Sequence, residues 1–338
     1  MSLTEPSNPR SSAVRVSKIH DSARKHVTGE AIYGDDIPEP RGLLHTFARL
    51  ADRAHARITH MNLDAVRRAP GVMAVISADD FQGGRNDIGP AGPGDLVFAD
   101  GEVQFYGQPL FAVAAETLDN ARAAAMLAEI DYEDLPAILS IEQALAAESE
   151  VAPPRQWLRG DPVAAISAAP HQLSGRTHFG GQEHFYLEGQ NVMVIPQEDG
   201  DMLVHSSTQQ PAQVQRAVAK VLGLPDHAVT VENRRMGGGF GGKETQPAWF
   251  AAIAAMLARC SGRPVKYRLD RDDDIIMTGK RQSSLLEYRV GFDDEGRILG
   301  IEQMQAADAG YSPDLSDAVA MRAMYHAENA YYFDNVRI

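Results

Sequence analysis

The run Arg234–Glu244 constrains the fold of this chain more than any other part of its sequence. Five of the six residues from Gly237 to Gly242 are glycine. Such a run supplies almost no side chains, and the backbone freedom of glycine disfavours a regular helix or strand there. A strand pattern precedes it and an apolar helical pattern follows it. We therefore predict a tight strand-to-helix turn that either is purely structural or lets its N–H groups approach an anion or an oxo ligand.

Two nucleotide-binding motifs match this run only in part. Gly237, Gly239 and Gly242 fit the pattern GxGxxG, and Gly237, Gly242 and Lys243 fit the start of a P-loop. Glu244 stands where a P-loop has the Ser or Thr that binds magnesium, and its carboxylate would repel phosphate. No clear βαβ unit with an acidic residue about 20 positions later follows, as a dinucleotide fold requires. The sequence therefore argues against a nucleotide site.

Composition restricts the classes of function. The formal net charge is −14, which disfavours binding to nucleic acid or to anionic membranes. The single cysteine, Cys260, can neither form an internal disulfide nor hold a metal cluster by itself, and we expect it in the core because it closes an apolar helix. No apolar run reaches the roughly 18 residues that span a bilayer, and no secretory signal is evident. We expect a cytoplasmic protein.

Mixed helical and strand patterns predict an α+β fold. We expect a flexible arm at 1–20, a first unit at 21–140, a connector at 141–175 and a second unit at 176–338. A long loop is predicted at 82–101 and a hairpin turn at 293–296. Strands are predicted at 71–76, 109–115, 128–132, 191–195, 202–206, 228–233, 265–269, 284–291 and 298–305, and helices at 117–128, 212–222 and 246–259.

Five long motifs together resemble the molybdopterin-binding subunit of the xanthine dehydrogenase family, and the resemblance extends from His20 to Arg337. It implies an α/β hammerhead domain at 21–140, followed by the first part of the molybdopterin-binding domain at 176–338. The motifs are GGQEHFYLEGQ (180–190), SSTQQP (206–211), RRMGGGFGGKE (234–244), RDDDIIMTGKR (271–281) and MRAMYHAEN (321–329).

The resemblance implies oxidative hydroxylation of hypoxanthine or xanthine to urate, with water as the source of oxygen. Molybdenum–molybdopterin is the implied cofactor, and a partner subunit would carry iron–sulfur clusters and FAD. The expected partners are that subunit, a purine substrate and, as a further option, a second copy of this chain in a homodimer. Binding to nucleic acid or to a membrane is not expected. Two alternatives stay open: a molybdenum hydroxylase of an aldehyde or N-heterocycle, and a non-catalytic assembly or binding module.

The resemblance also assigns residues to the cofactor. Gln209 is implied to lie beside the molybdenum without being a direct ligand, since an amide can donate a hydrogen bond there. On sequence alone, Gln209 is equally a turn or capping residue before the helix at 212–222. Gly239, Phe240 and Gly241 are implied to adjoin the cofactor through their backbone, although Phe240 also suits a core.

Two residues are implied to act on the substrate. Glu244 would hydrogen-bond the purine, and Arg322 would stabilise negative charge that develops on the ring. Without the resemblance, Glu244 is a glutamate in the first turn of a helix and Arg322 is a surface arginine. Aldehyde oxidases of the family lack this pair, so the pair favours a purine. His326 is expected on the helical face of Arg322.

Other polar residues carry weaker signals. Gln182 is a weak candidate for a position near the cofactor, and Glu183, His184 and Glu188 form a structural signature without metal-ligand spacing. The acidic run 270–274 indicates ion pairs or a solvated turn rather than a calcium loop.

The chain ends at Ile338, before the general base and the second glycine-rich segment that the family implies. We therefore expect a fragment that alone is inactive and binds the cofactor weakly or not at all.

Overall fold

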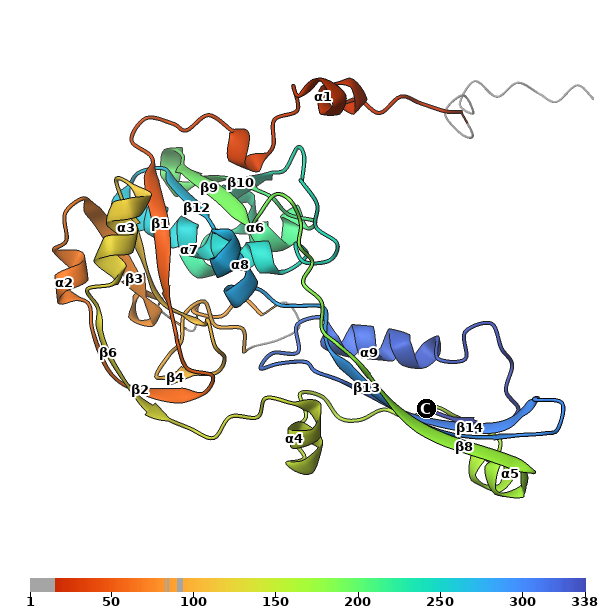
Figure 1. Cartoon of the computed structure of the whole chain (residues 1–338). Helices are drawn as coiled ribbons and strands as arrows, with labels where there is room; N and C mark the ends of the chain where they lie inside the picture. Colours follow the sequence, from red (N-terminus) through yellow and green to blue (C-terminus); the bar gives the residue numbers. More distant parts are fainter. Residues whose placement is uncertain (1–15, 82, 84, 90–93) are drawn as a thin grey trace, which may run out of the picture.

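The computed structural model describes residues 16–81, 83, 85–89 and 94–338. Figure 1 shows two lobes, one around a large sheet and one around a long, open sheet. Most of the predicted arm, residues 1–15, lies outside the described part, and 16–20 are exposed. No helix among the described residues has both the length and the apolar character needed to cross a membrane.

A seven-stranded sheet joins strands from both halves of the chain. The link is a parallel pairing of β1 with β12, in which Leu44 lies opposite Val265. β5 is buried along its whole length, as its unbroken apolar run predicts. In spatial order the strands are β11 (Val229–Glu232), β10 (Met202–Ser206), β9 (Asn191–Pro196), β12 (Val265–Arg268), β1 (Leu44–Leu50), β5 (Pro109–Ala115) and β3 (Val72–Ser77).

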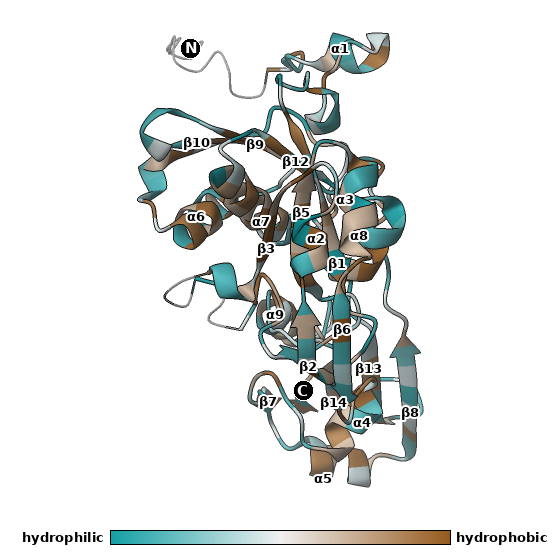
Figure 2. Cartoon of the chain, turned by 90° about the vertical axis from the view of Figure 1, so that its left-hand side faces the viewer, coloured by the Kyte–Doolittle hydropathy of each residue, from teal (hydrophilic) through white to brown (hydrophobic). Residues whose placement is uncertain are grey.

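Helix α7 (Gln246–Ser261) forms the centre of the core. Its residues from Pro247 to Ala258 are all buried, and hydrophobic residues concentrate on this helix and its neighbouring strands (Figure 2). Many of them are alanines, which allow α6 and the sheet to approach closely. The prediction that Cys260 belongs to the core is wrong: Cys260 is exposed because the last turn of α7 leaves the core.

Two further helices pack on this sheet, and each begins within one residue of its predicted start. α6 (Pro211–Leu222) begins with proline and stops at Gly223, whose φ of +66° favours glycine. α3 (Leu118–Ala125) is capped by Thr117, whose hydroxyl accepts a hydrogen bond from the N–H of Asn120. Local capping signals therefore place the starts of both helices and the end of α6, whereas α3 ends three residues before its predicted end at Ala128.

The second lobe is a five-stranded sheet covered on one face by α5 (Pro162–Ala168). Three of its elements lie within the predicted connector, 141–175: β7, α5 and most of β8. No strand was predicted at β8, because eight of its nine residues are exposed and leave no apolar alternation. In spatial order the strands are β7 (Leu158–Arg159), β15 (Val336–Arg337), β14 (Ile298–Ala307), β13 (Ser284–Phe292) and β8 (His171–Phe179).

Close packing of α5 on this sheet depends on glycine at Gly291. A Cβ atom there would lie 2.8 Å from both the Cα of Ile166 and the Cβ of Ala169. We expect Gly291→Ala to lower the free energy of unfolding by about 1–2 kcal/mol through overpacking. Urea unfolding measures this, with Gly279→Ala as the control because its Cβ meets nothing closer than 3.6 Å. Equal stability of the two variants would contradict the expectation.

A small three-stranded sheet, β4-β2-β6, completes the architecture and packs on a core that it shares with β5 and α3. The α+β prediction is confirmed, and the hairpin turn at 293–296 joins β13 to β14 as expected. The remaining elements are β2 (Ala56–Asn62), β4 (Glu102–Val103), β6 (Glu129–Asp134), α1 (Ala23–Thr28), α2 (Asp64–Arg67), α4 (Ile141–Ala146), α8 (Arg271–Met277), α9 (Ser316–Tyr325) and the short 3₁₀ turns η2 (Gly34–Asp36), η3 (Ala78–Asp80), η4 (Glu198–Gly200) and η5 (Asp226–Ala228).

Candidate functional site

The glycine-rich turn lies between β11 and α7, and side chains crowd it from several sides. A Cβ atom at Gly237 would lie 2.5 Å from the Cβ of Glu188. One at Gly239 would lie 2.5 Å from Oε1 of Gln209. These approaches explain why glycine is needed at both positions, and they show that the turn is built around neighbouring polar side chains.

The backbone of this turn presents unused donors. Gly238, Phe240 and Gly241 have φ angles of +98°, +56° and +95°. Over the described part of the chain, the N–H groups of Gly238, Gly239 and Phe240 donate to no protein acceptor. Phe240 is 75% exposed, so the alternative of a core aromatic is wrong. Consecutive free N–H groups of this kind form a concave site for anions or oxo groups.

Gln209 connects the turn to the segment that follows β10. Its Oε1 accepts hydrogen bonds from the N–H groups of Gly241 at 3.0 Å and Lys243 at 3.2 Å. Its Nε2 makes no hydrogen bond within the described residues and remains available as a donor. Gln209 does not cap α6, because Gln210 holds the N-cap position.

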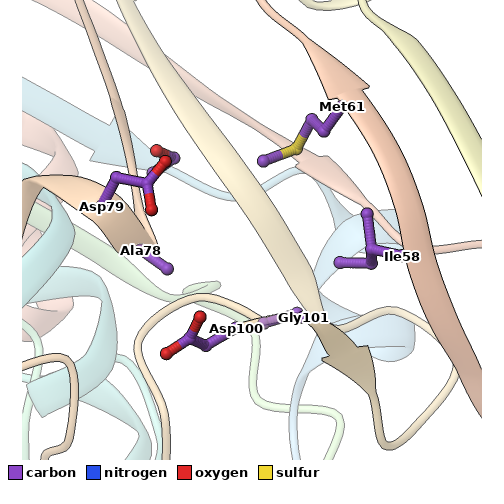
Figure 3. A pocket seen from close by; sticks show the side chains of 8 residues that line it. Ile58, Met61, Ala78, Asp79, Asp100 and Gly101 are labelled. Atoms are coloured by element: carbon purple, nitrogen blue, oxygen red, sulfur yellow. The ribbon is translucent and has the colours of Figure 1, made fainter.

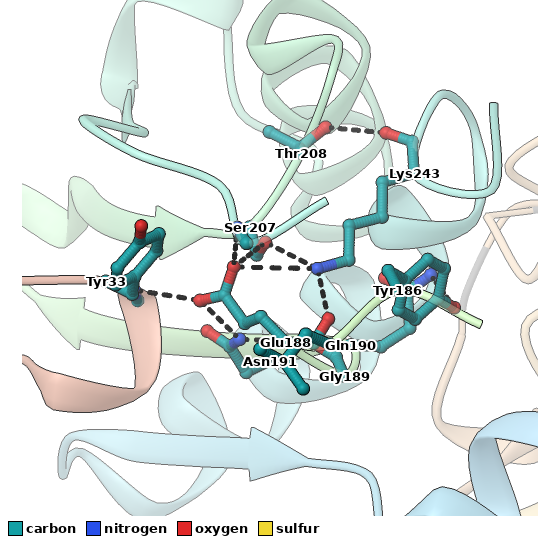
Figure 4. Close-up of polar contacts among 12 residues, drawn as sticks. Tyr33, Tyr186, Glu188, Gly189, Gln190, Asn191, Ser207, Thr208 and Lys243 are labelled. Atoms are coloured by element: carbon teal, nitrogen blue, oxygen red, sulfur yellow. Dashed lines mark hydrogen bonds and ion pairs between the residues drawn. The ribbon is translucent and has the colours of Figure 1, made fainter. Parts of the chain in front are cut away.

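Lys243, the residue directly after the glycine run, is buried. The side chain of Lys243 has no exposed surface, and its Nζ donates to the backbone oxygen of Glu188 at 2.6 Å and to Oγ of Ser207 at 2.8 Å. A Glu188 carboxylate oxygen lies 3.6 Å away, and the Tyr186 ring centroid 4.6 Å away (Figure 4). The sequence showed Lys243 only as part of a partial P-loop match, so its pairing with Glu188 was missed.

The carboxylate of Glu188 gathers donors from separate parts of the chain. It accepts from the N–H of Gly237 at 2.7 Å, Oγ of Ser207 at 2.8 Å, the N–H of Gly34 at 3.0 Å and Nδ2 of Asn191 at 3.2 Å (Figure 4). Since one oxygen binds the start of the glycine turn, Glu188 fixes that turn against β9 and the N-terminal segment. The sequence identified Glu188 only as part of a structural signature and did not predict these partners.

A second buried cluster supports the other side of the turn. Asp274 accepts from the hydroxyl of Tyr186 at 2.7 Å and from the N–H of Gln190 at 3.0 Å. Nε2 of Gln190 donates to the backbone oxygen of Gly242 at 2.9 Å. The acidic run at 270–274 therefore belongs to a structural hydrogen-bond cluster, and Asp270 pairs with Arg122 as the ion-pair alternative predicts. Nowhere in the described ranges do three or more His, Cys, Asp or Glu residues form a metal-binding group.

Burial gives Lys243 an unusual titration. Desolvation lowers its pKa from 10.5 to about 8, although the charges of Glu188 and Asp274 oppose this shift.

The lowered pKa of Lys243 makes the stability of the protein depend on pH. From about pH 8 to 10.5 the unfolded chain binds a proton that the folded protein does not, so the free energy of unfolding rises with pH. Between pH 7.5 and 9.5 we expect wild type to gain about 2 kcal/mol relative to Lys243→Met in urea unfolding. Parallel pH profiles of the two proteins would contradict this.

The two predicted substrate residues lie on different elements. Glu244 is half-buried at the end of the turn, whereas Arg322 is exposed on α9. No hydrogen bond or ion pair joins the two side chains in the part of the chain that the structure describes. The backbone oxygen of Arg322 accepts from the N–H of His326, which follows the helix.

The weaker candidates have structural partners. Gln182 pairs with Arg281 through its backbone and through Oε1 at 3.1 Å, and Glu183 forms an ion pair with Lys280 at 3.0 Å. The ring of His184 packs beneath the turn, and burial lowers its pKa. These contacts give Gln182 and Glu183 structural partners beside the turn.

Two hollows lie elsewhere on the molecule. One of about 90 Å³ is lined by residues such as Ile58, Met61 and Asp100 (Figure 3). The other, of about 510 Å³, is lined by residues of β8, β13 and β14 such as Arg176 and Arg289. Neither is lined by a predicted site residue, so neither replaces the glycine turn as the candidate site.

Two protein families match the chain. The family described as a molybdopterin cofactor-binding domain matches residues 145–338. The family described as the a/b hammerhead domain of aldehyde oxidase and xanthine dehydrogenase matches residues 28–136. The expected order, a hammerhead domain followed by a molybdopterin-binding region, is confirmed.

Curated relatives include both dehydrogenases and oxidases. A xanthine dehydrogenase of Oryza sativa subsp. japonica is 43% identical over 324 residues, which is 95% of this chain and 24% of that protein. An aldehyde oxidase 4 of Cavia porcellus is 37% identical over 335 residues, which is 98% of this chain and 25% of that protein. The chain thus spans about a quarter of the length of these relatives.

Solved structures share the fold. The aldehyde oxidoreductase of Desulfovibrio gigas superimposes with a TM-score of 0.85 at 27% identity, over 94% of this chain and 37% of that one. A quinoline 2-oxidoreductase of Pseudomonas putida 86 superimposes with a TM-score of 0.83 at 23% identity, over 95% of this chain and 43% of that one, and supports the fold alone.

Proposed function

The chain belongs to the molybdenum hydroxylase family, and from this premise we propose that it forms part of the cofactor and substrate site of an enzyme that hydroxylates a purine. The observation that carries the proposal is the glycine turn. Its free N–H groups at Gly238, Gly239 and Phe240 adjoin Gln209, whose Nε2 is also unpaired within the described residues. Such a set of donors suits an anionic, oxo-rich cofactor.

These residues fit a molybdenum–molybdopterin group. Glycine at Gly239 leaves no side chain between the turn and Gln209, and the exposed Phe240 lies beside them. In this proposal, Gln209 and the backbone of Gly239, Phe240 and Gly241 hold the group. When bound, it supplies two-electron oxidation of the substrate carbon with water as the source of oxygen. Iron–sulfur clusters and FAD on a partner subunit, and a cytoplasmic location, belong to the same proposal.

The choice of a purine rests on Glu244 and Arg322. A carboxylate at the end of the turn accepts hydrogen bonds from ring N–H groups, and a guanidinium stabilises negative charge on the ring. Relatives named as xanthine dehydrogenase and as aldehyde oxidase both match this chain, so similarity alone does not select the substrate. In this proposal, Glu244 and Arg322 select it. Aldehyde or N-heterocycle oxidation is the competing outcome.

Glu244→Ala tests this choice in the holoenzyme, meaning the complex of this chain with the polypeptides that complete the site. We expect kcat/KM for xanthine or hypoxanthine to fall about 10- to 30-fold, since one hydrogen bond to a charged group is lost. Turnover of an aromatic aldehyde should change less than about threefold, because an aldehyde lacks the ring N–H groups. Equal losses on both substrates would contradict the purine assignment.

The chain by itself should not form urate. Urate absorbance measured with the purified chain and xanthine is expected to stay at the level of the buffer control. The holoenzyme provides the positive control in the same assay. Urate formation by the isolated chain would show that its own residues suffice for the reaction, contrary to the proposal.

A further inference from the structure

We propose that Asp314 is a positioning residue for substrate recognition, which holds the start of α9 against the start of α7 and thereby sets Arg322 relative to Glu244. The inference rests on the proposed function only in assigning Glu244 and Arg322 to the substrate. Asp314 belongs neither to the glycine turn nor to the motif at 321–329, so the inference adds a residue to those that affect substrate binding.

Among the described residues, one hydrogen bond joins the two segments that carry the substrate residues. Oγ1 of Thr245 donates to Oδ2 of Asp314 at 3.0 Å. Thr245 follows Glu244 directly and occupies the N-cap position of α7. Asp314 lies just before α9, the helix that carries Arg322. The bond therefore couples the position of Arg322 to the backbone beside Glu244.

The start of α9 and the segment before it have anchoring contacts, whereas the rest of the helix is not buried. Tyr311 stacks on Phe105 with ring centroids 4.5 Å apart, and Ser316 accepts a hydrogen bond from Gln282. In contrast, α9 contains no buried residue. Because packing along the helix contributes little, the contacts at its start determine where Arg322 lies.

The local backbone and charges identify Asp314 as the central contact of this anchor. Its φ of +37° is uncommon for a residue other than glycine, and its N–H donates to Oγ of Ser312 at 3.2 Å. Burial raises the pKa of its carboxyl group, the hydrogen bond from Thr245 lowers it, and the charges of Asp95 and Glu244 raise it.

The experiment compares Asp314→Ala and Thr245→Val with the conservative variant Thr245→Ser, all in the holoenzyme. We expect the first two to raise KM for xanthine about tenfold with little change in kcat, and to leave aldehyde kcat/KM within about threefold. Thr245→Ser keeps the donor hydroxyl and should behave as wild type. Amide hydrogen exchange over 316–326 should become faster in Asp314→Ala and Thr245→Val only.

The control Asp317→Asn alters another acidic residue at the start of α9, whose ion pair with Arg155 is exposed to solvent and therefore contributes little to the position of the helix. It should leave both the substrate preference and the exchange rates unchanged. Equal losses on purine and aldehyde in Asp314→Ala, or an unchanged KM for xanthine, would overturn the inference while Glu244→Ala still shows its selective effect. If Glu244→Ala shows no selective effect, the proposed function fails, and the role assigned to Asp314 fails with it.

Discussion

Glu188→Ala is expected to lower the free energy of unfolding by about 3–5 kcal/mol, because it leaves the buried charge of Lys243 without its counter-ion. The same change removes the acceptor for the N–H groups of Gly34 and Gly237 and for Oγ of Ser207. Buried donors that lose their acceptor add to the cost. Urea unfolding followed by circular dichroism measures the effect.

Two controls separate this pairing from a general loss of charge. Glu183→Ala removes a carboxylate of the same segment that pairs with the partly exposed Lys280, and should cost less than about 1 kcal/mol. The double variant with Lys243→Met removes both charges and should recover part of the stability lost in Glu188→Ala. If Glu188→Ala cost no more than Glu183→Ala, Glu188 would not be the anchor of the glycine turn.

Gly239→Ala is expected to reduce the molybdenum content of the holoenzyme to less than about a tenth of wild type. The new Cβ would lie 2.5 Å from Oε1 and 2.9 Å from Cδ of Gln209. Since overpacking of this kind is relieved by moving a side chain or the backbone, Gln209 must leave the turn or the turn must open. Either change displaces the donors that the proposal assigns to the cofactor. Elemental analysis by mass spectrometry gives the molybdenum-to-protein ratio.

The matched control for this change is Gly180→Ala, where a Cβ would meet nothing within 4 Å. Its molybdenum content should equal that of wild type. The melting temperature of each variant is recorded beside the metal content, so that global unfolding is recognised as such. Full molybdenum content in a folded Gly239→Ala protein would contradict the role given to the turn.

Local patterns were sufficient for the core of the fold. Apolar runs identified β3 and β5, and proline and glycine signals placed α6 and α7 within two residues of their ends. Patterns failed where tertiary pairing decides the structure. β8 has an almost fully exposed surface and is a strand only because β13 pairs with it along nine residues. The parallel pairing of β1 with β12 joins distant segments, which no local pattern indicates.

The candidate site was also predictable only as far as local sequence patterns determine it. The density of glycine at 237–242 predicted a tight turn that is structural or approaches an anion or oxo ligand, whereas the groups that the structure places against its glycines include the side chains of Glu188 and Gln209. The partner of Lys243 was not predictable, because Glu188 is distant in sequence and is reached only when the loop before β9 folds over the turn. The roles of Gln209, Glu244 and Arg322 in binding remain predictions.

Anomalous X-ray diffraction from crystals of the holoenzyme at the molybdenum edge tests the central claim most directly. We expect a single strong molybdenum peak beside Nε2 of Gln209, with pterin density against the backbone of Gly239 and Phe240. Such a map would place the metal where the free donors of the turn converge. A molybdenum peak remote from Gln209, with the glycine turn contacting only protein, would contradict the claim that this turn forms part of the cofactor site.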